Sequence, residues 1–198
     1  MWTSYLYGMT KKRIGIFASG TGSNAVNLIR RFAGHPELEV AFVLSNVETA
    51  LVLNSAYELN IPIFYKSNDD CANGGLLCNF CQDQQLDWIV LAGYLRKVPV
   101  ELIHAFPKRI INLHPALLPK FGGKGMFGAN VHRAVLDAGE TETGITIHFV
   151  NEEFDKGKKI AQFYCQLEES DDLASVQKKI NQLEQTYLPK VVEATILH

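Results

Sequence analysis

The sequence lacks any apolar run approaching the roughly 18 residues that a membrane-spanning helix needs, which excludes an integral membrane protein of the helical type. It also lacks an excess of either charge, because 19 Lys and Arg stand against 21 Asp and Glu. Neither a nucleic acid nor a membrane surface is therefore an expected partner.

A secretory signal is missing as well. Residues 1–9 form a short, mostly apolar segment, and the positive charges at residues 11–13 follow it, which reverses the order of a signal peptide. We expect residues 1–9 to be a disordered extension, with Met9 as an alternative start. A cytoplasmic location is the expectation that follows from these absences.

Cysteine is scarce, with four in the chain. Cys78 and Cys81 have the CxxC spacing of a metal or redox pair. A zinc site needs a second pair of ligands, however, and none stands at a suitable spacing. Ordinary helix cysteines in a reducing cytosol are the favoured interpretation, and we expect no metal.

Linkers, internal repeats and low-complexity segments are absent too, and 198 residues suit one domain, which we expect over residues 1–198. Short apolar runs alternate with segments of helical spacing along the chain. Strands are predicted at residues 12–18, 40–44, 61–64, 87–91, 109–113, 144–150 and 159–167, and helices at residues 25–32, 49–59, 76–85, 99–105, 131–136 and 171–187.

The order of these elements predicts an α/β fold. Strands that alternate with helices form a doubly wound, mostly parallel, Rossmann-like sheet with helices on both faces. The strand at residues 87–91 is apolar almost throughout, as expected of a strand covered on both sides. A turn at residues 155–157 joins the last two strands, which predicts an antiparallel pair at the C-terminal end of the sheet.

A glycine-rich turn at residues 19–24 (SGTGSN) follows the first strand and opens the first helix. Backbone N–H groups converge on an anion at such a turn, and the helix dipole adds to the attraction. Gly22, Ser23 and Asn24 are the candidate phosphate ligands, and the side chains of Ser23 and Asn24 offer further hydrogen bonds. The pattern also fits a dinucleotide fingerprint, but Ser45 and Asn46 stand where that fingerprint wants an acidic residue. A merely structural turn is the third interpretation.

Asn112 and His114 stand at the end of the fifth predicted strand. Their side chains share a face because strand residues alternate, and Pro115 holds His114 extended. Ligands bind at the carboxyl ends of such strands, where Asn112 can stabilise an oxyanion and His114 can move protons. Asp155 is the carboxylate that could raise the pKa of His114. The alternative is that Asn112 caps a turn and His114 is a packed polar residue.

The segment at residues 111–119 (INLHPALLP) resembles the signature of the folate-dependent formyltransferases. Four further segments agree in order and spacing, namely residues 19–24 (SGTGSN), 91–96 (LAGYLR), 144–150 (GITIHFV) and 155–157 (DKG), so the resemblance covers residues 12–196. It is closest to the branch that formylates glycinamide ribonucleotide. The resemblance implies that the protein transfers the formyl group of 10-formyltetrahydrofolate to the amine of glycinamide ribonucleotide, a step of purine synthesis. It also implies a cytoplasmic monomer or homodimer that acts on small molecules and needs no metal.

The resemblance also implies roles for individual residues. Asn112, His114 and Asp155 would be catalytic, with His114 as the proton donor and Asp155 keeping it charged. Asn181 and Glu184 would bind the ribose and amine end of the acceptor. The folate site would consist of Leu95, Arg96, Lys97, Val98, Asn112, Asn151, Glu152, Glu153, Phe154 and Asp155. Alternatively Glu184 and Arg96 are surface charges, and His148, inside a strand, is interpreted as structural.

The sequence departs from the family pattern in two places. An arginine that often assists the folate tail is missing from residues 67–71, and the glycine-rich loop at residues 120–130 is longer than usual. We expect this loop to move over the cleft.

Three other functions compete with this interpretation. A methionyl-tRNA formyltransferase would add a C-terminal domain and a basic face. A formyltetrahydrofolate deformylase would add an N-terminal domain and is kept as the alternative. A regulatory module without catalysis is disfavoured because Asn112, His114 and Asp155 are all present.

Overall fold

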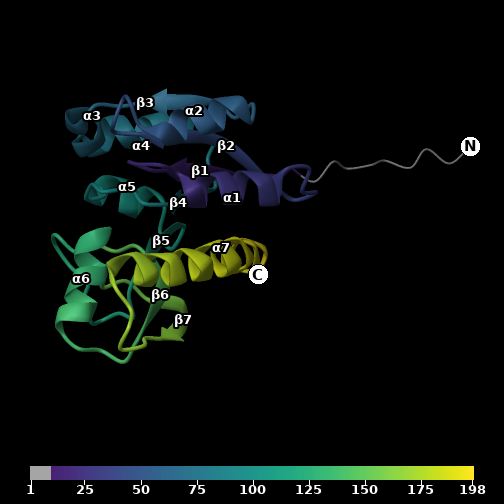
Figure 1. Cartoon of the computed structure of the whole chain (residues 1–198). Coiled ribbons are helices and arrows are strands. Elements are labelled where there is room, and N and C mark those ends of the chain that lie inside the picture. Colours follow the sequence, from purple (N-terminus) through teal and green to yellow (C-terminus); the bar gives the residue numbers. More distant parts are fainter. Residues whose placement is uncertain (1–9) are drawn as a thin grey trace, which may run out of the picture.

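Seven strands form one sheet in the computed structural model, which describes residues 10–198 (Figure 1). The extension expected at residues 1–9 lies outside the described residues. The sheet order is β3-β2-β1-β4-β5-β6-β7. The strands are β1 (Lys12–Phe17), β2 (Leu38–Ser45), β3 (Ile63–Tyr65), β4 (Trp88–Leu91), β5 (Ile110–His114), β6 (Glu142–Phe149) and β7 (Lys159–Gln166). The helices are α1 (Ser23–Phe32), α2 (Leu51–Glu58), α3 (Asn68–Ala72), α4 (Gly74–Asp83), α5 (Val100–Ala105), α6 (Ala129–Asp137) and α7 (Leu173–Leu197).

The pairing of the strands confirms the predicted fold class. Strands β1 to β5 pair in parallel, whereas β6 runs antiparallel to both β5 and β7. The chain winds from β1 outward to β3, returns to β4 on the other side of β1, and continues to β7. This reversal places a switch point between β1 and β4, and ligands bind at the carboxyl ends of the strands at such a point.

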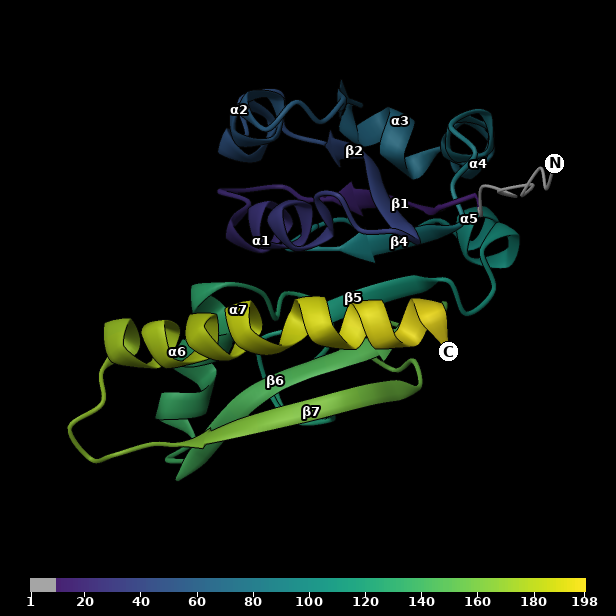
Figure 2. The ribbon, with the colours of Figure 1, turned by 90° about the vertical axis from the view of Figure 1, so that its right-hand side faces the viewer.

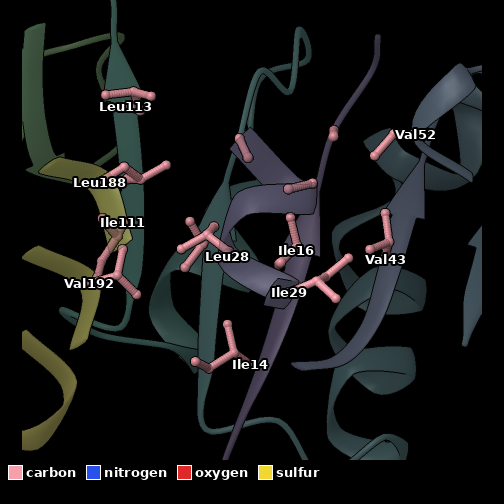
Figure 3. Packing of buried hydrophobic residues seen from close by; sticks show 14 of the residues in the cluster. Ile14, Ile16, Leu28, Ile29, Val43, Val52, Ile111, Leu113, Leu188 and Val192 are labelled. Carbon is pink, nitrogen blue, oxygen red and sulfur yellow. The ribbon is translucent and has the colours of Figure 1, made fainter. Parts of the chain in front are cut away.

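The two faces of the sheet carry separate apolar cores. Alternation along β1 sends Ile14 and Ile16 to one face and Phe17 to the other. The first face is covered by α1, α2 and α7, and Figure 3 shows Leu28, Ile29 and Val192 packed there. The second face is covered by α3, α4 and α5. Several of the polar side chains on the buried strands, Ser45, Asn112 and His114 among them, lie near the carboxyl ends of these strands.

Helix α7 extends ten residues beyond the predicted end at residue 187. Pro189 lies inside this extension; it lacks an N–H group, and proline in a helix interior costs about 3 kcal/mol. Burial of Leu188, Val192 and Ile196 in the first core offsets this cost, at roughly 1.5–3 kcal/mol for each fully buried side chain. As a result α7 runs along the whole face over β5 and β6 (Figure 2).

Helix α3 was not predicted, because its five residues are too few to show a helical period. A reciprocal capping box between Ser67 and Asp70 begins it. This helix occupies the region where an arginine for the folate tail is missing. The other predicted elements agree with the structure to within a few residues at each end.

Candidate active site

A cavity of about 710 Å³ opens at the carboxyl ends of the strands, at the switch point between β1 and β4. Its walls come from the turn before α1, the segment after β4, the end of β5, the loop before α6, the β6–β7 turn and one face of α7. Every residue proposed from the sequence lines this cavity except Gly22, which lies buried just behind the wall. Segments far apart in the chain therefore meet as predicted.

Asn112 and His148 form a direct pair across the antiparallel β5–β6 ladder. Their side chains lie on the same face, and Nδ2 of Asn112 is 3.0 Å from Nε2 of His148. Nδ1 of His148 lies 2.9 Å from the carbonyl oxygen of Phe149, to which it can donate. In that tautomer Nε2 accepts one Asn112 N–H, which fixes the amide and leaves its second N–H for a ligand in the cavity.

His114 is held from two sides at the bottom of the cavity. Its Nε2 donates to the carbonyl oxygen of Phe121 over 2.8 Å. Its Nδ1 lies 3.6 Å from a carboxylate oxygen of Asp155. The ring is 3% exposed, so its orientation is set by the protein rather than by water.

Asp155 reaches His114 from a strained turn with φ +55°, a conformation that Asp and Asn adopt more readily than most residues. One carboxylate oxygen accepts a 2.8 Å hydrogen bond from the backbone N–H of Gly123, and the other lies 3.6 Å from Nε2 of His148. Gly157 permits the turn, because a Cβ there would collide with the backbone carbonyl of Phe149. Asp155 therefore links both histidines to the glycine-rich loop.

The ionisation of this group differs from the expectation. Burial lowers the pKa of His114 below its usual value, and this effect exceeds the opposing influence of Asp155 and the Phe121 carbonyl. Burial acts to raise the pKa of Asp155, but His148, the Gly123 N–H and His114 together bring it below its usual value. The resting pair is thus a neutral imidazole beside a carboxylate, and the expectation that Asp155 keeps His114 charged was wrong.

The N-terminus of α1 is open toward the cavity. Gly22 precedes the helix with φ +81°, and no side chain caps the helix. Within the described residues no hydrogen bond uses the backbone N–H groups of Ser23 and Asn24. Such unpaired N–H groups at the positive end of a helix dipole suit a phosphate.

The side chain of Asn24 is held by α7, which the sequence did not predict, and its role toward an anion stays a prediction. Its Nδ2 donates to Glu184 over 2.8 Å, and its Oδ1 accepts from Gln185 over 2.8 Å. Burial raises the pKa of Glu184, and the hydrogen bond from Asn24 opposes this. Asn24 thus positions Glu184 on α7. Asn181 is exposed one turn earlier on the same helix, and both Asn181 and Glu184, the residues proposed to bind the acceptor, line the cavity.

Two segments enclose the side of the cavity assigned to folate. The segment from Leu95 to Val98 follows β4, and the segment from Asn151 to Asp155 forms the β6–β7 turn. Nζ of Lys97 lies 5.9 Å from the centre of the Phe154 ring, which brings the two segments together at the rim. Val98 is buried while Leu95 is half-exposed, so an apolar surface is available for a flat ring.

Two features are not found in the part of the chain that the structure describes, namely a metal site and a membrane-spanning helix. Across residues 10–198, no group of three or more His, Cys, Asp or Glu side chains is arranged to hold a metal ion. None of the helices over the same residues has the length and apolar character needed to cross a membrane.

Comparison with known proteins adds to this geometry. The sequence pattern described as formyl transferase matches residues 12–192. The chain belongs to the formyl transferase family.

The relatives of this formyl transferase agree with one another. The phosphoribosylglycinamide formyltransferase of Arabidopsis thaliana, described as chloroplastic, is 37% identical over 93% of this chain, which spans 65% of that protein's length. The phosphoribosylglycinamide formyltransferase of Haemophilus influenzae is 30% identical, with 92% of this chain and 86% of the relative covered. The solved structure of the Bacillus halodurans phosphoribosylglycinamide formyltransferase has a TM-score of 0.84, 33% identity, and coverage of 93% and 95%. The resemblance seen in the sequence is thereby confirmed.

The sequence did not assign two contacts of this formyl transferase's site. His148 was interpreted as structural, yet it contacts Asn112 and lies near Asp155; its register opposite Asn112 was the signal that could have revealed this. The Phe121 carbonyl was unpredictable, because the contact depends on the path of the loop at residues 120–130. That loop touches His114 and Asp155 directly, while its motion stays a prediction.

A substitution at Gly22 tests the anion site. A Cβ at Gly22 would collide with Val52, and φ +81° strains any L side chain. Gly22→Ala should raise the KM for a phosphorylated acceptor about tenfold or more by displacing the open N–H groups, with the KM for folate little changed. Gly20→Ala is the matched control, since a Cβ there meets nothing within 4 Å. Equal kinetics for both variants would remove the turn from the acceptor site.

Proposed function

We propose that this formyl transferase moves the formyl group of 10-formyltetrahydrofolate onto the amine of glycinamide ribonucleotide, a step of purine synthesis. One observation carries the proposal: Asn112, His114 and Asp155 meet in a cavity that also contains an open helix N-terminus. The first feature suits addition of an amine to a carbonyl, and the second suits an acceptor with a phosphate. The names of the similar enzymes support the same acceptor.

The acceptor is proposed to span the cavity from α1 to β5. The backbone of Gly22, Ser23 and Asn24 binds its phosphate, and Glu184 and Asn181 bind its ribose end. When the phosphate of the acceptor is bound at α1, the position of the amine at the other end of the acceptor is also restricted. Such positioning makes the reaction of the two bound substrates effectively unimolecular and lowers the activation free energy by several kcal/mol.

Asn112 and His114 are proposed to handle the charge and the proton of the reaction. The free N–H of Asn112 donates to the formyl oxygen as the amine nitrogen adds to the formyl carbon, when negative charge develops there. Because His114 is neutral at rest, the proton that it donates must first be taken up, directly or through water, from the attacking amine. Asp155 stabilises the imidazolium that then forms. The proton passes to the folate nitrogen as its bond to the formyl carbon breaks.

The co-substrate is proposed to lie between the segments that begin at Leu95 and Asn151. Val98 and Val150 supply an apolar surface that suits a flat heterocycle. Arg96 and Lys97 are exposed at the rim and are proposed folate contacts.

A cytoplasmic location is also part of the proposal. The described cysteines, Cys71, Cys78, Cys81 and Cys165, are all free thiols, as suits a reducing compartment.

A direct assay decides between this function and its main alternative. Purified protein should convert glycinamide ribonucleotide and 10-formyltetrahydrofolate into the formylated ribonucleotide and tetrahydrofolate, in equal amounts and without added metal. Mass spectrometry follows the first product and absorbance follows the second. Release of formate at the same rate with and without the ribonucleotide would instead establish a formyltetrahydrofolate deformylase.

A further inference from the structure

A histidine that the proposed mechanism does not use lies in the wall of the same cavity. His132 is on α6, is 4% exposed, and lines the cavity together with His114 and the α7 residues Ile180 and Asn181. Helix α6 packs against α7, so His132 lies on the side of the cavity assigned to the acceptor. Its neighbours on α6, Val131 and Val135, are buried apolar residues.

The ring of His132 is incompletely paired. Its Nδ1 is buried and has no hydrogen-bond partner among the described residues. An unpaired buried polar atom costs free energy that an apolar side chain of similar size would not. A purely structural position between Val131 and Val135 would be better filled by leucine, so the imidazole calls for a functional reason.

The surroundings of the ring favour one tautomer. Burial, followed by the influence of His114, lowers the pKa of His132, so the ring is neutral and carries a single proton. A proton on Nδ1 would be a buried N–H without an acceptor. The proton therefore belongs on Nε2, which makes this nitrogen the hydrogen-bond donor that a ligand in the cavity can use.

We propose that His132 binds the acceptor substrate, with its Nε2–H donating a hydrogen bond to an uncharged oxygen in the ribose or glycinamide portion. A neutral ring suits an uncharged oxygen, while the phosphate is served by the N-terminus of α1. The position beside α7 and near His114 corresponds to the stretch between the phosphate and the reacting amine. The inference rests on the proposed function, since it assumes a phosphoribosyl amine as acceptor.

Two variants of matched size test the donor. His132→Gln places an amide N–H near the position of Nε2, whereas His132→Leu fills the space without a donor. Calorimetry with glycinamide ribonucleotide should show a Kd about tenfold or more higher for His132→Leu, and within about threefold of the native value for His132→Gln. Affinity for tetrahydrofolate should stay within about twofold in both. The Tm of His132→Leu should equal or exceed that of the native protein, because an unpaired polar atom has been removed.

The outcomes separate this inference from the proposed function. Native protein that does not bind glycinamide ribonucleotide would remove the proposed acceptor, and the role of His132 with it. Tight binding by the native protein and equally tight binding by His132→Leu would overturn the role of His132 alone. Equal weakening in the Leu and Gln variants would assign His132 to packing and would also overturn the inference.

Discussion

Replacement of His114 by alanine should lower kcat for formyl transfer about 10³-fold, while the KM values of both substrates change by threefold or less. General acid–base groups contribute about 10²–10⁴-fold to rates, and His114 lies where the amine proton must be moved. Its contacts are with Phe121 and Asp155 rather than with the open end of α1, so substrate binding should be largely retained. Steady-state kinetics with each substrate varied in turn measures the separation.

A second variant shows whether His114 moves a proton or only holds the loop. The Phe121 carbonyl accepts a hydrogen bond from Nε2 of His114, so His114→Ala also releases residues near Phe121. His114→Gln keeps an N–H donor for that carbonyl but cannot accept and return a proton at neutral pH. Both variants should therefore be slow, and recovery of kcat in His114→Gln would reduce His114 to a loop anchor. His35→Ala, a histidine outside the cavity, should leave kcat unchanged.

The sequence was sufficient for the fold because its signals are local and agree with one another. Apolar runs such as the one in β4 reveal buried strands, and Asp172 marks the start of α7 with a capping box. The end of α7 was missed because it depends on burial of Leu188, Val192 and Ile196 against distant strands. A local pattern around Pro189 contains no information about that burial.

The residues proposed from the sequence, apart from Gly22, line one cavity, but His132 and the ionisation of His114 were not predicted. Strand alternation predicted that Asn112 and His114 share a face, and the turn before the last strand together with the family resemblance added Asp155 to them. The charge on His114 depends on how deeply the ring is buried, which lowers its pKa, and on the Phe121 carbonyl and Asp155, which raise it; the depth of burial is not visible in the local sequence. His132 was not proposed either, because its unpaired Nδ1 becomes visible only when the elements around it have been placed.

Replacement of Asp155 by asparagine should lower kcat at neutral pH at least about 100-fold, since the imidazolium formed during the reaction loses its carboxylate partner. Asparagine tolerates φ +55°, and its Oδ1 can still accept the Gly123 N–H, so the turn should be retained. A variant that only loosened the loop would instead raise both KM values.

The pH dependence of kcat should also change in a defined direction when Asp155 is replaced by asparagine. His114 must be neutral to take up the amine proton, so kcat of the native enzyme should fall as the pH decreases through the lowered pKa of His114, below about 6.5. In Asp155→Asn the carboxylate that opposes this lowering is gone, so the pKa of His114 falls further and the acid limb moves to still lower pH. The variant should thus combine a lower plateau with a wider pH range. An acid limb that stays in place, or moves to higher pH, would separate Asp155 from the titration of His114.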